Sequence, residues 1–375
     1  MTNSTSRPVV SPLAIWVGLL TLYFVWGSTY VGIKVAVESI PAFLMGSGRF
    51  LLAGLLLLGW SLAREGRAAL RISRIELRDS FVVGSLLLGG GMGMVALGEQ
   101  TVPAGITALI IALMPLWVAV LGRVIFGERT SRIVLVGIVL GLAGIVILVA
   151  PTGIGALALS AGGIAALMVS PISWATGSLY SSHRARLPRL PLVATAMQMF
   201  CGAAVLGVLS LATGELTHFS PAAVTDRSWL AFAYLVTVGS GIGYTTYVWM
   251  LRVAPLTKIA TYAYVNPIVA FVLGAIVLGE TITARTVVAA VVIVVAVAII
   301  VTARSRTPAG PGTVATIEVG EPALERPPKP GVATPAHGTT PSTGTAPPAG
   351  AAGSTGTSAV PSAGTSPTSP AELAT

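Results

Sequence analysis

The sequence has few charged side chains. Of its 375 residues, 9% are Asp, Glu, Lys or Arg, whereas 54% are hydrophobic. A soluble globular domain carries about a quarter charged residues, because its surface has to be hydrated. A charge content this low excludes a water-soluble enzyme. The net charge of +9 does not indicate nucleic-acid binding either, because the basic residues stand in small groups between apolar runs instead of forming a dense basic face.

Cysteine and histidine are also scarce. Cys201 is the one cysteine, so the chain has no disulfide framework. The histidines His183, His218 and His337 are far apart in the sequence, so we expect no metal site. The glycine motifs that resemble phosphate- or dinucleotide-binding loops lie inside apolar runs, and the sequence has no HExxH motif. These absences predict a protein without a cofactor and without a catalytic centre.

Long hydrophobic runs are abundant. A helix needs about 20 apolar residues to cross the hydrocarbon core of a bilayer. Ten runs approach this length, with boundaries good to a few residues: 13–34, 41–62, 80–99, 104–123, 132–150, 157–180, 190–212, 228–250, 258–278 and 285–303. They lack the alternation of barrel strands. We therefore predict an all-α integral membrane protein with ten transmembrane helices surrounded by lipid.

The Lys and Arg residues between the runs predict the topology, because cytoplasmic loops carry an excess of them. They occupy alternate connections: Arg64, Arg67, Arg71, Arg74 and Arg78; Arg129 and Arg132; Arg184, Arg186 and Arg189; Arg252 and Lys258; and Arg304 and Arg306. The other connections hold mainly acidic residues: Glu38, Glu99, Glu215, Asp226 and Glu280. The pattern predicts a multi-pass protein of the cytoplasmic (inner or plasma) membrane with both termini in the cytoplasm.

Both ends of the chain are expected to lie outside the helical part. Residues 1–12 form a short amino-terminal tail, and residues 304–375 form a long carboxyl-terminal one. From residue 307 onward the chain holds 13 of its 25 prolines and no aromatic residue, in mixtures of Ala, Gly, Ser and Thr. Such a segment cannot bury a core, so we predict a disordered cytoplasmic tail.

The two halves of the chain repeat each other. Pro103, Pro115 and Gly127-Glu128 recur 152 residues later as Pro255, Pro267 and Gly279-Glu280. This predicts two domains, residues 13–150 and 157–303, of five spans each. Five is odd, so the second domain enters the membrane from the opposite side, and acidic connections of one half match basic connections of the other. Inverted repeats of this kind are typical of secondary transporters.

Short motifs in both halves carry a family resemblance. They are Trp26-Gly27-Ser28-Thr29-Tyr30, Arg49-Phe50, Val102-Pro103-Ala104-Gly105, Ser173-Trp174-Ala175 and Tyr262-Ala263-Tyr264-Val265-Asn266-Pro267. Through them the chain resembles the EamA-domain proteins of the drug/metabolite transporter superfamily, and among these the YedA-type bacterial inner-membrane proteins. The resemblance covers residues 13–303. It implies ten helices, a central cavity between the repeats, and export of amino acids, metabolites or drug-like compounds.

Arg49 is the most unusual charge. It lies about eight residues into its run, roughly 12 Å deep at the rise of an α-helix. A charge at that depth is costly unless it faces a cavity or a partner. We interpret Arg49 as a contact for an anionic substrate or a gating partner. The alternative is an arginine tied to backbone carbonyls, and the corresponding residue of the second half is the neutral Gln198.

Four other charged residues lie near the ends of runs. Glu99 is equally consistent with proton coupling and with an ordinary interfacial carboxylate. Lys34 is expected to extend to the membrane interface. Glu128 and Glu280 recur by symmetry at helix ends, which favours a structural capping role.

Two prolines fall near the middle of predicted spans. Pro115 and Pro267 each remove a helical hydrogen bond and kink the helix, and broken helices often line transporter sites. Asn266 adds an amide beside the second kink. Tyr262 and Tyr264 precede it and cannot share one helix face, so we expect one to line the cavity while the other packs.

Polar and aromatic residues are concentrated on spans 1, 6, 8 and 9. Together they predict a cavity suited to amphipathic solutes and organic cations, although interfacial anchoring or helix packing is the better explanation of each one alone. They are Trp26, Ser28, Thr29, Tyr30, Trp174, Ser178, Tyr244 and Tyr247.

The sequence therefore predicts a secondary transporter of a small metabolite, amino acid or drug-like solute, working by alternating access in the direction of export. Proton antiport and facilitated diffusion are the two candidate energetic modes, and the sequence does not separate them. Gly137 and Gly141 form a helix-contact motif that would suit a homodimer. The alternatives are a metabolite importer, an integral membrane enzyme, or a membrane scaffold or sensor without transport activity.

Overall fold

The computed structural model describes residues 11–127, 131–149, 160–254, 259 and 261–305. The chain divides into two units, residues 1–323 and 324–375, and every described residue belongs to the first. Glu128 lies outside the described residues. So do the predicted tails, except for residues 11, 12, 304 and 305.

The described residues form helices and no strand. The longer single helices are α1 (Pro12–Ala36), α2 (Ala42–Glu65), α7 (Arg132–Val149), α8 (Ala161–His183), α9 (Pro191–Ala212), α14 (Tyr262–Leu278) and α15 (Ala284–Ser305). Other helices run on in series: α3 (Arg74–Gly84), η2 (Ser85–Met92) and α4 (Gly93–Glu99); α5 (Ala104–Ala112) and α6 (Met114–Phe126); α11 (Asp226–Tyr234), η4 (Leu235–Ile242) and α12 (Gly243–Val253). Short turns occupy Gly66–Leu70, Glu215–His218 and Pro221–Ala223.

Seven of these helical stretches are long and apolar enough to cross a membrane. They are Pro12–Ala36, Ala42–Glu65, Arg74–Glu99, Ala104–Ile125, Arg132–Val149, Pro191–Ala212 and Ala284–Ala303. Helix α14 is apolar but shorter, at 17 residues. The all-helical fold is thus confirmed, while the number of ten spans stays a prediction, because α8 and the α11–α12 series are not among the seven.

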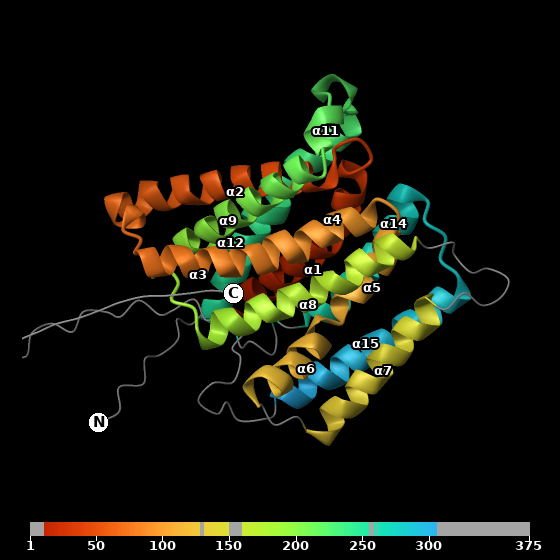
Figure 1. The fold of residues 1–375 in the computed structure, drawn as a ribbon. Coiled ribbons are helices and arrows are strands. Elements are labelled where there is room, and N and C mark those ends of the chain that lie inside the picture. The colour runs from red at the N-terminus through yellow and green to blue at the C-terminus, as the bar shows by residue number, and fades with distance from the viewer. Residues whose placement is uncertain (1–10, 128–130, 150–159, 255–258, 260, 306–375) are drawn as a thin grey trace, which may run out of the picture. The chain divides into compact units, whose positions relative to one another are not determined.

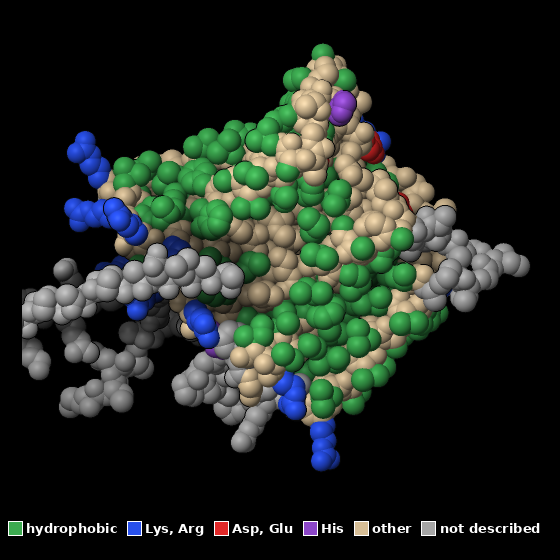
Figure 2. Space-filling model, in the orientation of Figure 1, with side chains coloured by type: hydrophobic (Ala, Val, Ile, Leu, Met, Phe, Trp, Pro, Cys, Tyr) green, Lys and Arg blue, Asp and Glu red, His purple; other side chains and the backbone are tan. Residues whose placement is uncertain are grey.

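The outer faces of the helices are apolar, as lipid contact requires. At least 47% of the surface of each of four apolar residues is exposed: Leu51 and Leu55 on α2, Val139 on α7 and Ile276 on α14. Figure 2 shows hydrophobic side chains along the helices and Lys and Arg side chains at the ends of α2, α3 and α6. We call the end that carries Arg67, Arg71 and Arg186 the basic end, and the opposite one, with Glu38, Glu215 and Glu280, the acidic end.

The helices pack in pairs that draw one member from each half of the chain (Figure 1). Helix α2 lies against α9, and α7 lies against α15. Helix α1 packs on α14, while α8 packs on α5 and α6. When the two halves are exchanged, the α2–α9 and α7–α15 pairs are unchanged. The pairing of α1 with α14 becomes the pairing of α8 with α5 and α6.

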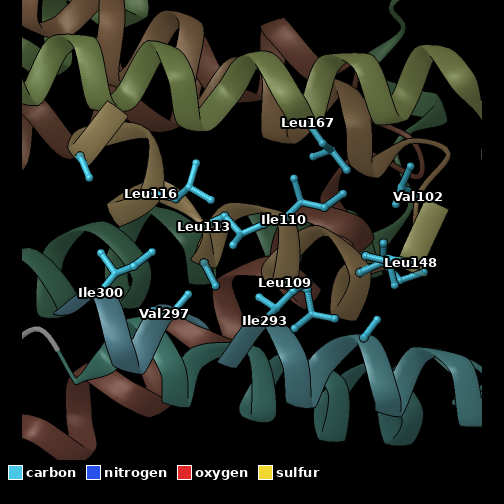
Figure 3. Close-up of a cluster of buried hydrophobic side chains, with 14 of the residues drawn as sticks. Val102, Leu109, Ile110, Leu113, Leu116, Leu148, Leu167, Ile293, Val297 and Ile300 are labelled. Atoms are coloured by element: carbon cyan, nitrogen blue, oxygen red, sulfur yellow. The ribbon is translucent and has the colours of Figure 1, made fainter. Parts of the chain in front are cut away.

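One core cluster joins α5, α6, α7, α8 and α15, of which α6, α7 and α15 lie at the bottom of Figure 1. Leu109, Ile110 and Leu113 of the α5–α6 segment contact Ile293 and residues of α7, α8 and α15 in a layer of fully buried aliphatic side chains (Figure 3). Since lipid tails are as apolar as leucine, this contact stabilises the fold through close packing more than through removal of apolar surface from water.

At the acidic end, two carboxylates cap helices of the other half. Glu280 accepts hydrogen bonds from the backbone N–H groups of Ala104 (2.6 Å) and Gly105 (3.2 Å) at the start of α5. Glu215 accepts from those of Phe43 (3.1 Å) and Leu44 (2.8 Å) at the start of α2. Both helices have proline at the cap position, which supplies no side-chain acceptor. The carboxylates therefore satisfy amides that would otherwise lack a partner.

The local sequence explains how Glu280 reaches α5. Gly279 adopts a left-handed conformation with φ 66°, and the N–H of Glu280 bonds to the carbonyl of Gly274, which ends α14 as glycine commonly ends helices. A Cβ atom on Gly274 would lie 2.5 Å from Oε2 of Glu280. Glycine at both positions lets the carboxylate fold back, so the expected capping role of Glu280 is confirmed.

We expect Glu280→Ala to lower the free energy of unfolding by about 1–2 kcal/mol, because two helix amides lose a charged acceptor. Unfolding of the purified protein in detergent by added SDS measures this. Glu65→Ala is the matched control, since Glu65 is exposed at the end of α2. Equal stability of the two variants would show that the cap contributes nothing.

Candidate functional site

A cavity of about 150 Å³ lies at the centre of the helices. Its wall comes from both halves of the chain. Its lining residues are Trp26, Thr29, Tyr30, Arg49, Phe50, Leu88, Met92, Val95, Ala108, Ile111, Ala112, Met114, Pro115, Ser170, Pro171, Trp174, Ser178, Gly239, Ser240, Tyr244, Tyr247, Tyr262, Ala263, Asn266 and Pro267. Most of these side chains are apolar or aromatic, and the polar ones are few, as in many small-molecule sites.

Four aromatic rings form one wall of the cavity. The ring of Trp26 on α1 lies 5.1 Å from that of Tyr247 and 6.4 Å from that of Tyr244, both on α12. It meets the ring of Tyr262 on α14 edge to face at 4.9 Å, measured between centroids. Such tilted and edge-to-face pairs are the favoured arrangement of aromatic rings. Trp26 therefore joins three helices, and the aromatic wall presents both ring faces and phenol groups.

Prolines interrupt the helices beside this wall. The α5–α6 segment breaks at Leu113, and Pro115 follows as the second residue of α6. Pro267 lies inside α14, where its missing N–H leaves the carbonyl of Ala263 without its helical partner. With its amide turned so that the nitrogen faces these acceptors, Asn266 donates to the backbone carbonyls of Tyr23 and Tyr262, at 3.2 Å each. The amide thus fastens the kinked helix to α1.

Arg49 also lines the cavity. It is the eighth residue of α2 and 5% exposed, and its Nε donates to Oγ of Ser240 on η4 at 3.2 Å. The guanidinium carbon lies 5.2 Å from the ring centroid of Phe50, within range of a cation–π contact. Its position deep in the helical bundle places a positive charge in the cavity wall, where an anionic group of a ligand would meet it.

Two π-helical segments complete the wall. Residues Ser85–Met92 and Leu235–Ile242 occupy matching places in the two halves, and π-helical turns are rare outside functional sites. Ser240 and Gly239 come from the second segment, next to Arg49. Sequence reasoning did not select Ser240, although the glycines that flank it mark an irregular helix. It also did not select Pro171, a third proline inside a helix on the cavity.

The structure brings twelve of the sixteen sequence-predicted site residues to the cavity and places four elsewhere. Ser28 is buried, and its hydroxyl bonds to the carbonyl of Phe24 and to the hydroxyl of Tyr234. Gln198 is buried on α9, where its backbone packs closely against Gly84. Tyr264 packs against the cluster of Figure 3, while Tyr262 lines the cavity, the division expected for two tyrosines that cannot share one helix face.

Glu99, the fourth, ends α4 one helical turn beyond Val95, which does line the cavity. Its side chain is 0% exposed. Neither carboxylate oxygen has a hydrogen-bond partner among the described residues. The carboxylate is therefore enclosed by the protein, and both alternatives for Glu99 stay predictions.

Lys34 lies beside the end of α4 and is part-buried, and its extension to the membrane interface stays a prediction. Its ammonium donates to the backbone carbonyl of Glu99 and, at 3.2 Å, to that of Val102. The last carbonyls of a helix lack intrahelical partners and lie at the negative end of the helix dipole. They therefore stabilise a cation such as the lysine ammonium. The lysine thus ties α1 to the end of α4.

The glycine motifs serve helix packing. A Cβ atom on Gly91 would lie 2.8 Å from the ring of Trp174. One on Gly137 would lie 2.6 Å from Ile300, and one on Gly141 would lie 2.8 Å from Leu113. The Gly137–Gly141 motif therefore contacts helices of the same chain, and the homodimer stays a prediction without that support. Among the described residues no cluster of His, Cys, Asp and Glu could hold a metal ion.

Comparisons with known proteins extend this description. The sequence profile of the EamA-like transporter family matches residues 13–150 and again residues 161–302. The chain is 38% identical over 264 residues to the uncharacterized inner membrane transporter YedA of Escherichia coli (strain K12), covering 70% of this chain and 82% of that protein. It is 28% identical over 255 residues to protein PecM of Dickeya dadantii, covering 67% and 80% respectively.

A solved crystal structure has a similar fold. It aligns with a TM-score of 0.54 at 20% identity, over 79% of this chain and 100% of the other. The uncharacterized transporter YoaV of Bacillus subtilis is 24% identical over 267 residues, which cover 69% of this chain and 87% of that protein. The resemblance expected from the sequence motifs is confirmed by these matches.

Cysteine accessibility tests the cavity. Ser178 and Ser28 are similarly buried, at 5% and 8% exposure, but only Ser178 lines the cavity. In a Cys201→Ala background we expect Ser178→Cys to react with a small charged thiol reagent at least about tenfold faster than Ser28→Cys, because thiolate chemistry needs water. Mass spectrometry of the intact protein measures the rates. Equal rates would contradict the placement of the cavity.

Proposed function

Because the chain belongs to the EamA-like transporter family, we propose that it is a secondary transporter that moves a small solute across the cytoplasmic membrane by alternating access. The central cavity carries this proposal: it draws its wall from both halves of the chain and sets a buried arginine against an aromatic surface. A relative with 38% identity bears the name of an inner membrane transporter, which supports the same membrane for this chain.

The symmetry of the contacts supports a rocking mechanism. The pairings of α1 with α14 and of α8 with α5 and α6 exchange when the halves are exchanged, and the two π-helical segments correspond in the same way. In an inverted repeat such contacts are equivalent but face opposite sides of the membrane. A site between the halves opens to one side when one set of contacts loosens and to the other side when the second set does.

The acidic end is closed in this conformation. Glu280 and Glu215 bridge the halves there, Lys34 ties α1 to α4, and the hydroxyl of Ser228 on α11 donates to the carbonyl of Val35 at 2.8 Å. The distribution of arginines assigns this end to the outside. We therefore propose that the structure is a conformation closed toward the outside.

The solute that fits this cavity has an anionic group and an aromatic or apolar body. The anionic group would meet Arg49, whose Nε is held by Ser240 while the rest of the guanidinium has no hydrogen bond to a described residue. The body would stack on the rings around Trp26. A cavity of about 150 Å³ accommodates a molecule near the size of benzene. A larger solute would require the helices to separate, as alternating access does.

Export is the direction we propose, with the solute leaving the cell down its own gradient. Import of a metabolite is the alternative, and an enzyme or a scaffold would move no solute at all. Reconstitution into proteoliposomes with labelled amino acids, labelled N-acetyl-L-tryptophan and a cationic dye separates these functions. Folded protein that carries none of these compounds would contradict the transporter proposal.

Arg49→Gln tests the site in the same proteoliposomes. We expect the flux of N-acetyl-L-tryptophan to fall about 10- to 100-fold, because the loss of one charge-assisted hydrogen bond costs about 1.5–3 kcal/mol. Arg49→Lys, which keeps the charge, should retain more flux than Arg49→Gln. Arg67→Gln, at the exposed basic end, is the control and should be unaffected. Undiminished flux in a folded Arg49→Gln protein would leave Arg49 with a structural role.

Reporter fusions test the inverted repeat. A cytoplasm-active reporter inserted within residues 63–79 should be active, and one within residues 213–227 should be inactive, because the two connections correspond but are proposed to face opposite sides. A periplasm-active reporter should give the opposite pattern. Activity of one reporter at both positions would rule out the inversion.

A further inference from the structure

Glu99 is a buried charged residue that does not line the cavity. It is fully buried, and both of its oxygens lack a hydrogen-bond partner among the described residues. An ionised carboxylate without donors is costly inside a protein and more so inside a membrane. Such a group needs a proton, or the field of nearby cations, to remain there. A neutral side chain at this position would avoid the cost, so the carboxylate calls for a function.

Four charged or phenolic groups act electrostatically on Glu99. They are Lys34 and Tyr30 of α1, Arg49 of α2, and Glu280 from the connection between α14 and α15. Helix α4 also packs against α5 and α8, whose segments facing it carry no titratable side chain. The environment of Glu99 is thus set by two positive groups, one negative group and one phenol.

Two of these charges are fixed by backbone groups. The ammonium of Lys34 is bound by the carbonyls at the end of α4, and the carboxylate of Glu280 is bound by the amides at the start of α5. A helix C-terminus stabilises a cation and a helix N-terminus stabilises an anion. The positive charge of Lys34 and the negative charge of Glu280 sum to zero. Glu99 and Arg49 are then the charges that a proton or an anionic solute can compensate.

Charge balance then links the two sites. The charges of Lys34, Arg49, Glu280 and Glu99 sum to zero while Glu99 is ionised. They sum to plus one once Glu99 is protonated. Binding of a monoanion at Arg49 restores zero. A core with a net charge is costly in the low dielectric of the membrane interior. The empty core and the core that holds both proton and anion are neutral, whereas either one alone leaves a charge.

We propose that Glu99 is the proton-binding site of the transporter, and that one proton crosses on its carboxylate together with one anionic solute at Arg49. The inference rests on the proposed transport function and names its coupling ion. An inside-alkaline pH gradient then opposes export, so export requires an outward solute gradient larger than the pH gradient. The carboxylate takes up a proton to become the carboxylic acid and returns it to water on the other side. Among the four groups that act on Glu99, Tyr30 is the one that does so through a phenol, and it also lines the cavity.

This arrangement makes a particular prediction for Glu99→Gln. The amide mimics the protonated acid permanently, so the empty core keeps a charge of plus one and only the anion-loaded core is neutral. The variant should exchange internal for external anion but should not carry out net transport. Protein that is simply misfolded would lose both activities.

Net uptake and exchange of labelled N-acetyl-L-tryptophan in proteoliposomes measure the two activities. With an inside-alkaline gradient of about one pH unit, a one-to-one carrier accumulates the anion up to about tenfold. We expect this accumulation in the wild-type protein and in Glu99→Asp, which keeps a titratable group. Glu99→Gln should show exchange without accumulation, and Glu65→Gln, at an exposed carboxylate, should behave as the wild type.

The outcomes separate this inference from the proposal on which it rests. Accumulation by Glu99→Gln, or wild-type flux that ignores the pH gradient, would overturn the role of Glu99 while leaving the transporter intact. Loss of exchange in Glu99→Gln, with the protein still monodisperse in detergent, would also overturn it. Absence of any flux in folded wild-type protein would overturn the proposed function, and the coupling with it.

Discussion

The structure depends on how few charges a membrane interior tolerates. Arg49 and Glu99 are both nearly or fully buried in the helical bundle. Each charge costs several kcal/mol or more in that environment unless it has a partner or a water-filled cavity. Arg49 lies in the wall of a cavity, Glu99 follows the cavity-lining Val95 by one helical turn, and backbone groups at helix ends bind Lys34 and Glu280. The remaining interior is apolar or aromatic.

The same constraint organises the acidic end. Helices α2 and α5 begin at prolines that offer no side-chain cap, and carboxylates from the other half fill the gap. A cap supplied from within the same half would hold regardless of how the halves move. A cap supplied across the halves breaks when they separate. In the proposed rocking mechanism, the starts of α2 and α5 are therefore points at which the contacts of the acidic end would open and close.

Much of this was predictable from the sequence, since lipid imposes simple rules. Length and apolar content predicted the helices, and the depth of Arg49 in its run predicted a charge at the cavity. The two tyrosines divided between cavity and core because of helical periodicity. The contact of Lys34 with the end of α4 was not predicted, because the carbonyl of Glu99 that binds it lies 65 residues away along the chain. Ser240 and Pro171 were missed, since a π-helical segment and a proline's orientation depend on the packing of neighbouring helices.

In the proposed mechanism, the transporter changes the side to which its site is open only when the charges of the core, the proton and the solute sum to zero. The most direct test of this claim is the response of net N-acetyl-L-tryptophan flux to a potassium diffusion potential, imposed with valinomycin at equal pH on both sides. The account predicts the same flux with and without the potential, since proton and anion cross together. A flux that follows the potential would show that charge crosses with each solute, and would contradict the account.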